Sequence, residues 1–267
     1  MKIWILALNT LQGLLRSRVV LVLFFVYVAI LLLSLSPMLF IRHSAAAANG
    51  ADLSGFFLSE MKGLVEITSS VGSLFAMVGG AYVVSSEIRS GTILAVMARP
   101  VARWEAVAGA YLGVQALLVL YIAFMLGFEE VVSLIAHQRI ATSWWVLFAY
   151  PFVRYLLYSA VGLFFSVFAG PVLAVAATFL ISILAQMLEG NGGIVSHLPG
   201  PVLTPLRYVF PSVGLLGEER YLSVTSSPLN TWRLSQHLTA LGHGLDYACI
   251  MLLLAAWVFR RRPLVRA

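Results

Sequence analysis

The stretch Val19–Phe40 reads VVLVLFFVYVAILLLSLSPMLF and contains no charged residue. A helix needs about 20 apolar residues to cross the hydrocarbon core of a bilayer, and this stretch has that length. The rest of the 267-residue chain is similar, because 61% of its residues are hydrophobic and only 10% are charged, with a mean hydropathy of +0.95. Soluble domains carry about 25% charged residues. The sequence therefore predicts an all-α polytopic membrane protein.

Working outward from Val19–Phe40, further apolar runs of similar length predict six transmembrane helices within a single domain that covers residues 1–267. The predicted spans are Val19–Phe40, Leu64–Val84, Trp104–Phe128, Trp144–Phe168, Pro171–Leu188 and His237–Phe259. The end of the third span is the least defined, because EEVVSLIAHQR after it is compatible with a loop, a bent helix end or a dipping segment. Residues 190–236 form the longest polar stretch, with turn signals such as GNGG and PGP, and are too short for a core of their own.

Residues 1–18, before the first span, have the pattern of an amphipathic helix. The apolar face consists of residues at helical spacing, namely Trp4, Leu8, Leu11 and Leu15. The polar face consists of Asn9, Gln12, Gly13 and Arg16, and is interrupted by Ile5 and Leu6. Such a segment is too short and too polar to span, so we expect it to lie in the membrane interface. A plain extension of the first span is the alternative.

The basic residues are divided unevenly between the two sides that six spans define. The more basic side holds Lys2, Arg16, Arg18, Arg89, Arg99, Arg103, Arg260, Arg261, Arg262 and Arg266. The other side holds Arg42, Lys62, Arg139, Arg207, Arg220 and Arg233. Because the more basic side of a membrane protein is cytoplasmic, both termini and the loop 85–103 are predicted to be cytoplasmic, and residues 190–236 extracytoplasmic.

The cytoplasmic loop lies within Ser85–Gly113, which reads SSEIRSGTILAVMARPVARWEAVAGAYLG. Thr92 can cap a short apolar helix, ILAVMA, that Pro100 ends. The helix presents Ile93, Leu94, Val96 and Met97 inside a rim of Glu87, Arg89, Arg99 and Arg103. An apolar centre within a charged rim is typical of a protein-docking surface, and a helix resting on lipid headgroups is equally compatible with the spacing.

The run from Glu87 to Gly113 resembles the signature loop of type 2 ABC transporter permeases. That pattern has an acidic residue, a Gly-Thr pair, a hydrophobic helix, Pro-Val-x-Arg and late glycines. The matching positions are Glu87, Gly91, Thr92, Pro100, Val101, Arg103, Gly109 and Gly113. The family often has a lysine beside the first late glycine, whereas Ala108 and Ala110 flank Gly109 here, so no basic contact is implied there. The N-terminal amphipathic helix and the C-terminal VFRRRPL extend the similarity.

The resemblance implies the permease subunit of an ATP-driven exporter in the bacterial cytoplasmic membrane. The loop would contain a coupling helix between the second and third spans, docking on a separate nucleotide-binding ATPase subunit. The residues implied in docking are Glu87, Arg89, Gly91, Thr92, Ile93, Leu94, Met97, Arg99, Pro100 and Arg103. Residues 1–18 would be a connecting helix, a second permease chain would complete a dimer, and ATP and Mg²⁺ would be held by the ATPase.

The sequence agrees that ATP hydrolysis needs another chain. Its only lysines are Lys2 and Lys62, and neither follows the G-x-x-x-x-G of a P-loop. The alternative functions are a non-transporting membrane scaffold or assembly subunit driven by an associated ATPase, and an unrelated membrane enzyme. The apolar spans favour a lipid, a hydrophobic drug or a protein's lipid moiety as cargo over a highly charged solute.

Several polar residues within or near the spans have more than one interpretation. Arg154 lies in mid-span, where an arginine costs about 2.5–3.5 kcal/mol, so it is either a substrate or gating contact or an ion-pair partner of Glu66, Asp246 or Glu129. His243 and Asp246 are three residues apart and share a helix face. They are either a weak metal or proton site or ordinary polar residues at a helix end. The small residues of span two suit a tight contact within the bundle or a pathway wall at a dimer interface. They are Ser69, Ser70, Gly72, Ser73, Gly79 and Gly80.

Enzyme and metal motifs are missing from the sequence. It has no H-E-x-x-H, no G-x-S-x-G and no paired intramembrane Asp, and its single cysteine, Cys249, allows no thiolate cluster. We therefore expect no catalytic, cofactor-binding or metal-binding residues on this chain, and partners that are proteins and the lipid bilayer rather than nucleic acid.

Overall fold

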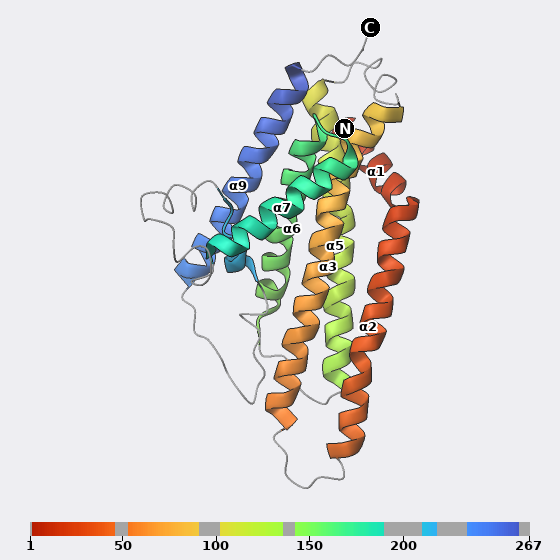
Figure 1. Cartoon of the computed structure of the whole chain (residues 1–267), viewed down its shortest axis with the longest axis vertical. Helices are drawn as coiled ribbons and strands as arrows, with labels where there is room; N and C mark the ends of the chain where they lie inside the picture. Colours follow the sequence, from red (N-terminus) through yellow and green to blue (C-terminus); the bar gives the residue numbers. More distant parts are fainter. Residues whose placement is uncertain are drawn as a thin grey trace.

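The computed structural model describes residues 2–45, 53–90, 102–135, 142–189, 210–217 and 234–261, and within these ranges every secondary-structure element is a helix (Figure 1). The elements are α1 (Lys2–Leu15), α2 (Arg18–Ala45), α3 (Leu53–Ser90), α5 (Arg103–Ile135), α6 (Trp144–Ser166), α7 (Pro171–Glu189), the 3₁₀ turn η2 (Gly214–Leu216) and α9 (Leu234–Arg261).

Five of the described helices are long and apolar enough to cross a membrane, namely α3, α5, α6, α7 and α9. The helices α1 and α2 meet the same test together, as a pair bent by 61°, which brings the number to six if the pair is one span. The predicted all-helical fold is confirmed for the described residues, and five long apolar helices suggest a multi-pass membrane protein, whereas the six-span count stays a prediction.

Two helices extend well beyond the predicted spans. Helix α3 runs from Leu53 to Ser90, so the residues from Ser85 to Ser90 at the start of the predicted loop are its last turns. Helix α5 continues through the glutamates at 129 and 130 to Ile135, which excludes a loop over that part of EEVVSLIAHQR. The extensions contain no proline, and their only glycines are Gly55 and Gly63 in α3, so no strong local signal ends these helices earlier.

The bend between α1 and α2 is set by Ser17. Its hydroxyl oxygen accepts a hydrogen bond from the backbone N–H of Val20 (3.2 Å), which is the geometry of a serine that caps a helix start. The N–H of Ser17 itself bonds to the carbonyl oxygen of Leu14 (3.0 Å), closing the last turn of α1. One residue therefore ends one helix and begins the next at a different angle.

The bundle is built around α3 and α6, which pack along each other at its centre. Helices α5 and α7 each contact both of them, α9 lies against α6, and α2 lies against α3. Helix α1 lies across the first turns of α5 (Figure 1). We call the end where α3 finishes at Ser90 and α5 starts at Arg103 the loop end; α9 also finishes there, at Arg261 (Figure 1).

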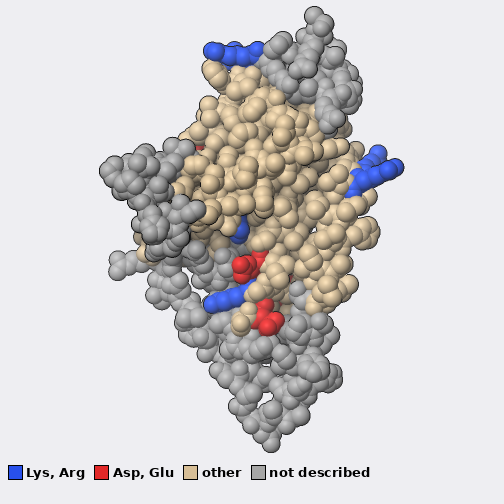
Figure 2. All heavy atoms as spheres, viewed as in Figure 1, with Lys and Arg blue, Asp and Glu red and all other residues tan. Residues whose placement is uncertain are grey.

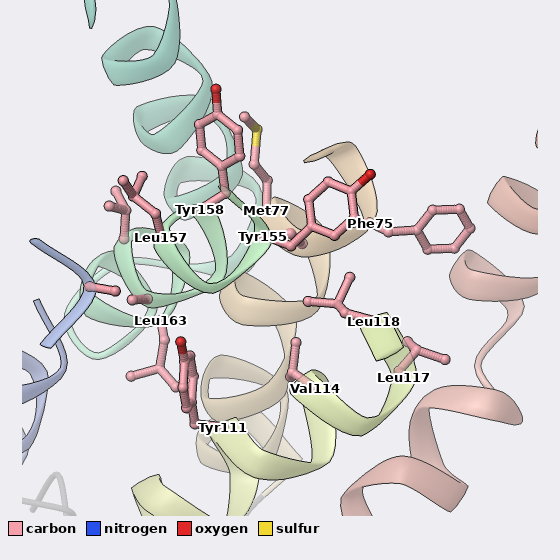
Figure 3. Close-up of a cluster of buried hydrophobic side chains, with 14 of the residues drawn as sticks. Phe75, Met77, Tyr111, Val114, Leu117, Leu118, Tyr155, Leu157, Tyr158 and Leu163 are labelled. Atoms are coloured by element: carbon pink, nitrogen blue, oxygen red, sulfur yellow. The ribbon is translucent and has the colours of Figure 1, made fainter. Parts of the chain in front are cut away.

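The α3–α6 contact depends on glycine in both helices. A Cβ atom on Gly80 would lie 2.8 Å from Cα of Ser159 and would overlap the Ser159 carbonyl oxygen, and one on Gly162 would lie 2.9 Å from the carbonyl oxygen of Met77. The two backbones therefore touch, as small residues allow in membrane helices. Apolar and aromatic side chains of α3, α5 and α6, several of them labelled in Figure 3, belong to one buried cluster.

Candidate functional site

The predicted docking residues gather at the loop end, on either side of a segment that the structure does not describe. Glu87 and Arg89 are on the last turns of α3, and Arg103 is the first residue of α5. The remaining predicted docking residues lie outside the described part of the chain: Gly91, Thr92, Ile93, Leu94, Met97, Arg99 and Pro100. The predicted segment 190–236 likewise falls outside it, apart from residues 210–217 and the start of α9.

Helix α5 begins immediately after this segment because Glu105 caps it. The carboxylate of Glu105 accepts a hydrogen bond from the backbone N–H of Ala102 (2.8 Å), and the Glu105 N–H bonds back to the Ala102 carbonyl oxygen (2.9 Å). This is the glutamate half of a capping box. An acidic side chain in the first turn also suits the positive end of the helix dipole. The segment 91–101 therefore leads into a helix start that is held in place.

Helix α1 packs on α5 through the two late glycines of the sequence pattern, and we call this contact the α1–α5 seam. A Cβ atom on Gly109 would lie 2.6 Å from Cβ of Leu6, and one on Gly113 would lie 2.7 Å from the carbonyl oxygen of Ala7 and 2.6 Å from Cβ of Thr10. Gly109 and Gly113 are four residues apart and so share one face of α5. Any larger side chain at either position would force α1 away from α5.

The side of α1 that faces α5 was not recognised from the sequence. Ala7 and Leu14 are buried, and Leu6, which the sequence pattern placed on the polar side, lies in the seam. The predicted apolar face is instead largely exposed, with Trp4 at 68% and Leu8 at 45%. Helix α1 thus has one apolar side on protein and another that is free to contact lipid. The small-xxx-small spacing of Gly109 and Gly113 is the sequence signal for the contact between α1 and protein.

The opposite side of α5 is tied to α6 by side-chain hydrogen bonds. The Tyr111 hydroxyl donates to the carbonyl oxygen of Leu156 (2.9 Å), and the Gln115 amide donates to the hydroxyl oxygen of Ser159 (2.7 Å). Both donors lie within one turn of Gly113, and Ser159 is the residue whose backbone touches Gly80 of α3. Contacts therefore run without a gap from α1 through α5 and α6 to α3.

Arg154 points from α6 toward α3 and is held by a polar group there. Its Nη1 donates to the Ser69 hydroxyl oxygen at 2.9 Å, and the Tyr155 hydroxyl lies 3.4 Å from the Ser69 carbonyl oxygen. Ser69 and Ser73 are buried, Gly72 faces the side chains of Tyr155 and Tyr121, and Gly80 faces the Ser159 backbone, so these small residues of span two lie in contacts within the bundle. Ser70 is exposed.

The carboxylates predicted near Arg154 differ in their surroundings. Glu66 on α3 and Asp246 on α9 are exposed, whereas Glu129 on α5 is buried, at 1% exposure. The site predicted from Arg154, Glu66 and Asp246 therefore has one half-buried member and two exposed ones.

The two histidines near the start of α9 differ in their surroundings. The Nδ1 atom of His237 lies 2.7 Å from the Tyr150 hydroxyl oxygen, and its ring meets Trp145 edge-on at 5.2 Å. His243 is half-buried and Asp246 is exposed. Within the described ranges, no group of three or more His, Cys, Asp or Glu residues could hold a metal ion.

Comparison with known proteins adds no further information on this site. No protein-family model matches the chain, and no curated protein matches it.

Proposed function

We propose that this chain is the permease subunit of an ATP-driven ABC transporter, working as an exporter in the bacterial cytoplasmic membrane. The proposal begins from the resemblance of Glu87–Gly113 to the signature loop of type 2 ABC permeases. The observation that carries it furthest is the α1–α5 seam, because it gives Gly109 and Gly113 of that pattern a physical role.

The seam supports a coupling mechanism by its place in the chain. It starts six residues after Arg103, directly beyond the segment on which a motor subunit would act. A push on that segment moves the first turns of α5, and α1 must follow because the two backbones are in contact. Tyr111 and Gln115 pass the same displacement to α6. One loop thereby acts on both the surface helix and the centre of the bundle.

The charge distribution supports a cytoplasmic loop end. The corner between α1 and α2 carries Arg16 and Arg18, and the end of α9 carries Arg260 and Arg261, all exposed. Figure 2 shows blue basic side chains at the top and upper right of the molecule, and further blue side chains beside the red acidic patches in its middle and lower part. With α2 as the first of six proposed spans and α1 in the interface, the positive-inside rule then puts both termini in the cytoplasm.

In this proposal the chain is not itself an enzyme. A separate nucleotide-binding subunit holds ATP and Mg²⁺ and docks on the loop between α3 and α5, and a second permease chain completes the path through the membrane. The lipid-like or hydrophobic cargo expected from the apolar spans moves along that path.

The test is purification of the tagged chain from membranes of its own host, with ATP hydrolysis measured in the eluate. We expect an ATP-hydrolysing subunit to accompany the full chain and to be lost when Gly91–Met97 is deleted. Glu87→Lys and Leu94→Pro should leave the bundle folded and abolish coupling. A Lys62→Gln variant, altered at the opposite end, is the control and should retain the ATPase.

The outcome against the proposal is a folded chain that brings no ATPase, or one whose ATPase survives the deletion. Reconstitution of the purified complex then separates a transporter from a scaffold, because only a transporter moves a lipid or solute across vesicles when ATP is added.

A further inference from the structure

An open groove of about 560 Å³ lies at the loop end between the first turn of α5 and the last turns of α9. Trp104 of α5 forms one wall. The α9 wall consists of Leu253, Leu254, Ala256, Trp257 and Arg260. A volume in the range of roughly 300–1,000 Å³ is typical of sites that hold a small molecule.

The groove changes from apolar to basic along α9. Leu253 at its inner end is 71% exposed and lies two turns before Arg260, which is about 10 Å at 1.5 Å per residue. Trp257, which is 52% exposed, lies between these two levels on α9, and Trp104, also 52% exposed, lines the groove from α5. Arg261 completes the basic end, with its guanidinium carbon 4.2 Å from the centre of the Trp257 ring.

This order of groups matches one phospholipid molecule. Tryptophans at the end of a membrane helix lie at the level of the headgroups, and the apolar residues before them lie in the hydrocarbon region. An acyl chain would then cover the leucines, and the phosphate would lie between the two arginines. Arginine at the cytoplasmic end of a span attracts anionic lipid, at about 1 kcal/mol for each basic residue.

The acidic group nearest in sequence, Glu105, is engaged elsewhere. Its carboxylate accepts a hydrogen bond from the Ala102 N–H at the start of α5. The basic end itself carries two adjacent exposed arginines, Arg260 and Arg261, which favour a negatively charged headgroup.

We propose that this groove binds an anionic phospholipid from the leaflet at the loop end. The site lies beyond the proposed transport function and does not depend on it. Because it joins the start of α5 to the end of α9, a bound lipid bridges the helix that follows the coupling segment and the last helix of the bundle.

The test uses the full chain reconstituted in vesicles of equal parts phosphatidylglycerol and phosphatidylcholine, extracted in mild detergent and examined by native mass spectrometry. We expect the wild-type chain to retain phosphatidylglycerol in preference to phosphatidylcholine. Arg260→Gln together with Arg261→Gln should reduce that preference by about fivefold per arginine. Ala256→Phe, which fills the groove without changing charge, should reduce the amount of lipid retained.

The matched control is Arg16→Gln with Arg18→Gln, which removes the same charge at the α1–α2 corner and should leave the preference unchanged. Equal retention of both lipids by the wild-type chain would overturn the proposal, as would an equal loss in the control pair or no effect of Ala256→Phe. In a Cys249→Ser background, disulfide-linked dimers of Leu253→Cys would assign the groove to a second copy and would also overturn it. No arm uses ATP, so failure here is distinguishable from failure of the transport proposal.

Discussion

Two glycine-based helix contacts in this protein look alike and are placed differently. The α3–α6 contact, at Gly80 and Gly162, is at the centre of the bundle and is enclosed by the core side chains of α3, α5 and α6. The α1–α5 seam, at Gly109 and Gly113, is at the loop end, and beyond it the outer face of α1 is exposed. Glycine therefore allows close packing in both contacts, but only α1, in the α1–α5 seam, could be displaced without disrupting the core.

The difference predicts separate roles for the two contacts. Displacing α6 from α3 would break the core and the hydrogen bonds that Arg154 and Gln115 make. Displacing α1 from α5 would expose a few side chains, such as Ala7 and Leu14, to the membrane surface. We therefore expect the first contact to determine stability and the second to determine how movement is passed on.

The largest effect should come from Gly80→Leu. Its side chain would meet the backbone of Ser159, which cannot move aside as a flexible side chain could. The cost should reach the upper end of the roughly 1–3 kcal/mol typical of overpacking. Thermal unfolding in detergent should give a much lower midpoint, or no folded protein.

The control for that change is Gly63→Leu in the same helix, where a Cβ would meet nothing within 4 Å. Its unfolding midpoint should stay close to that of the wild type. Equal destabilisation by the two variants would show that the α3–α6 contact is not special.

A smaller effect on stability is expected from Gly109→Leu combined with Gly113→Leu. The new side chains should push α1 off α5, because they would overlap Leu6 and Thr10. Limited proteolysis should cleave within residues 2–17 faster than in the wild type, while the rest of the chain stays protected and unfolds at nearly the same temperature. The matched control is Gly127→Leu, farther along α5, where a Cβ would meet nothing within 4 Å. Collapse of the whole bundle would contradict a separable α1.

The smallest effect concerns the polar link between α6 and α3. Arg154→Gln and Ser69→Ala each remove one partner of a 2.9 Å hydrogen bond, so the double variant should cost less than the sum of the two. A coupling free energy of about 0.5–1.5 kcal/mol is expected from denaturant unfolding of the four proteins. Strict additivity would remove Ser69 as the group that holds Arg154. Wild-type transport by a folded Arg154→Gln variant would assign that arginine to packing.

Much of the fold could be predicted from the sequence because hydrophobic length decides it. Apolar runs identified α5, α6, α7 and α9 to within a few residues at most ends, and Pro171 after a short Ala-Gly turn marked the start of α7. The length of α3 was underestimated, because Glu60, Lys62 and Glu87 interrupt the apolar pattern without interrupting the helix. Hydropathy identifies only the segment that crosses the hydrocarbon core, whereas the helix itself ends where caps replace its backbone hydrogen bonds.

The candidate site was predicted less completely, for a related reason. The pattern placed Gly109 and Gly113 in a motif, but not their contact with α1, since spacing within one segment does not identify the partner helix. The cap at Ser17, which bends α1 away from α2, was not predicted from the sequence, although a serine before an apolar run is a known signal for a helix start. Leu6 faces protein rather than the polar side of α1. This could not be predicted, because it depends on the packing of two helices far apart in the sequence.

The most direct test of the account is ATP-driven transport by the Gly113→Leu variant, measured in vesicles that contain the co-purified ATPase. The account predicts that the variant folds and retains the ATPase, and that transport falls by roughly tenfold or more. The reason is that about 1.4 kcal/mol against the docked position of α1 lowers the ratio of docked to released α1 tenfold. The Gly127→Leu control should transport normally. Undiminished transport by a folded Gly113→Leu protein, with α1 released from α5, would contradict it.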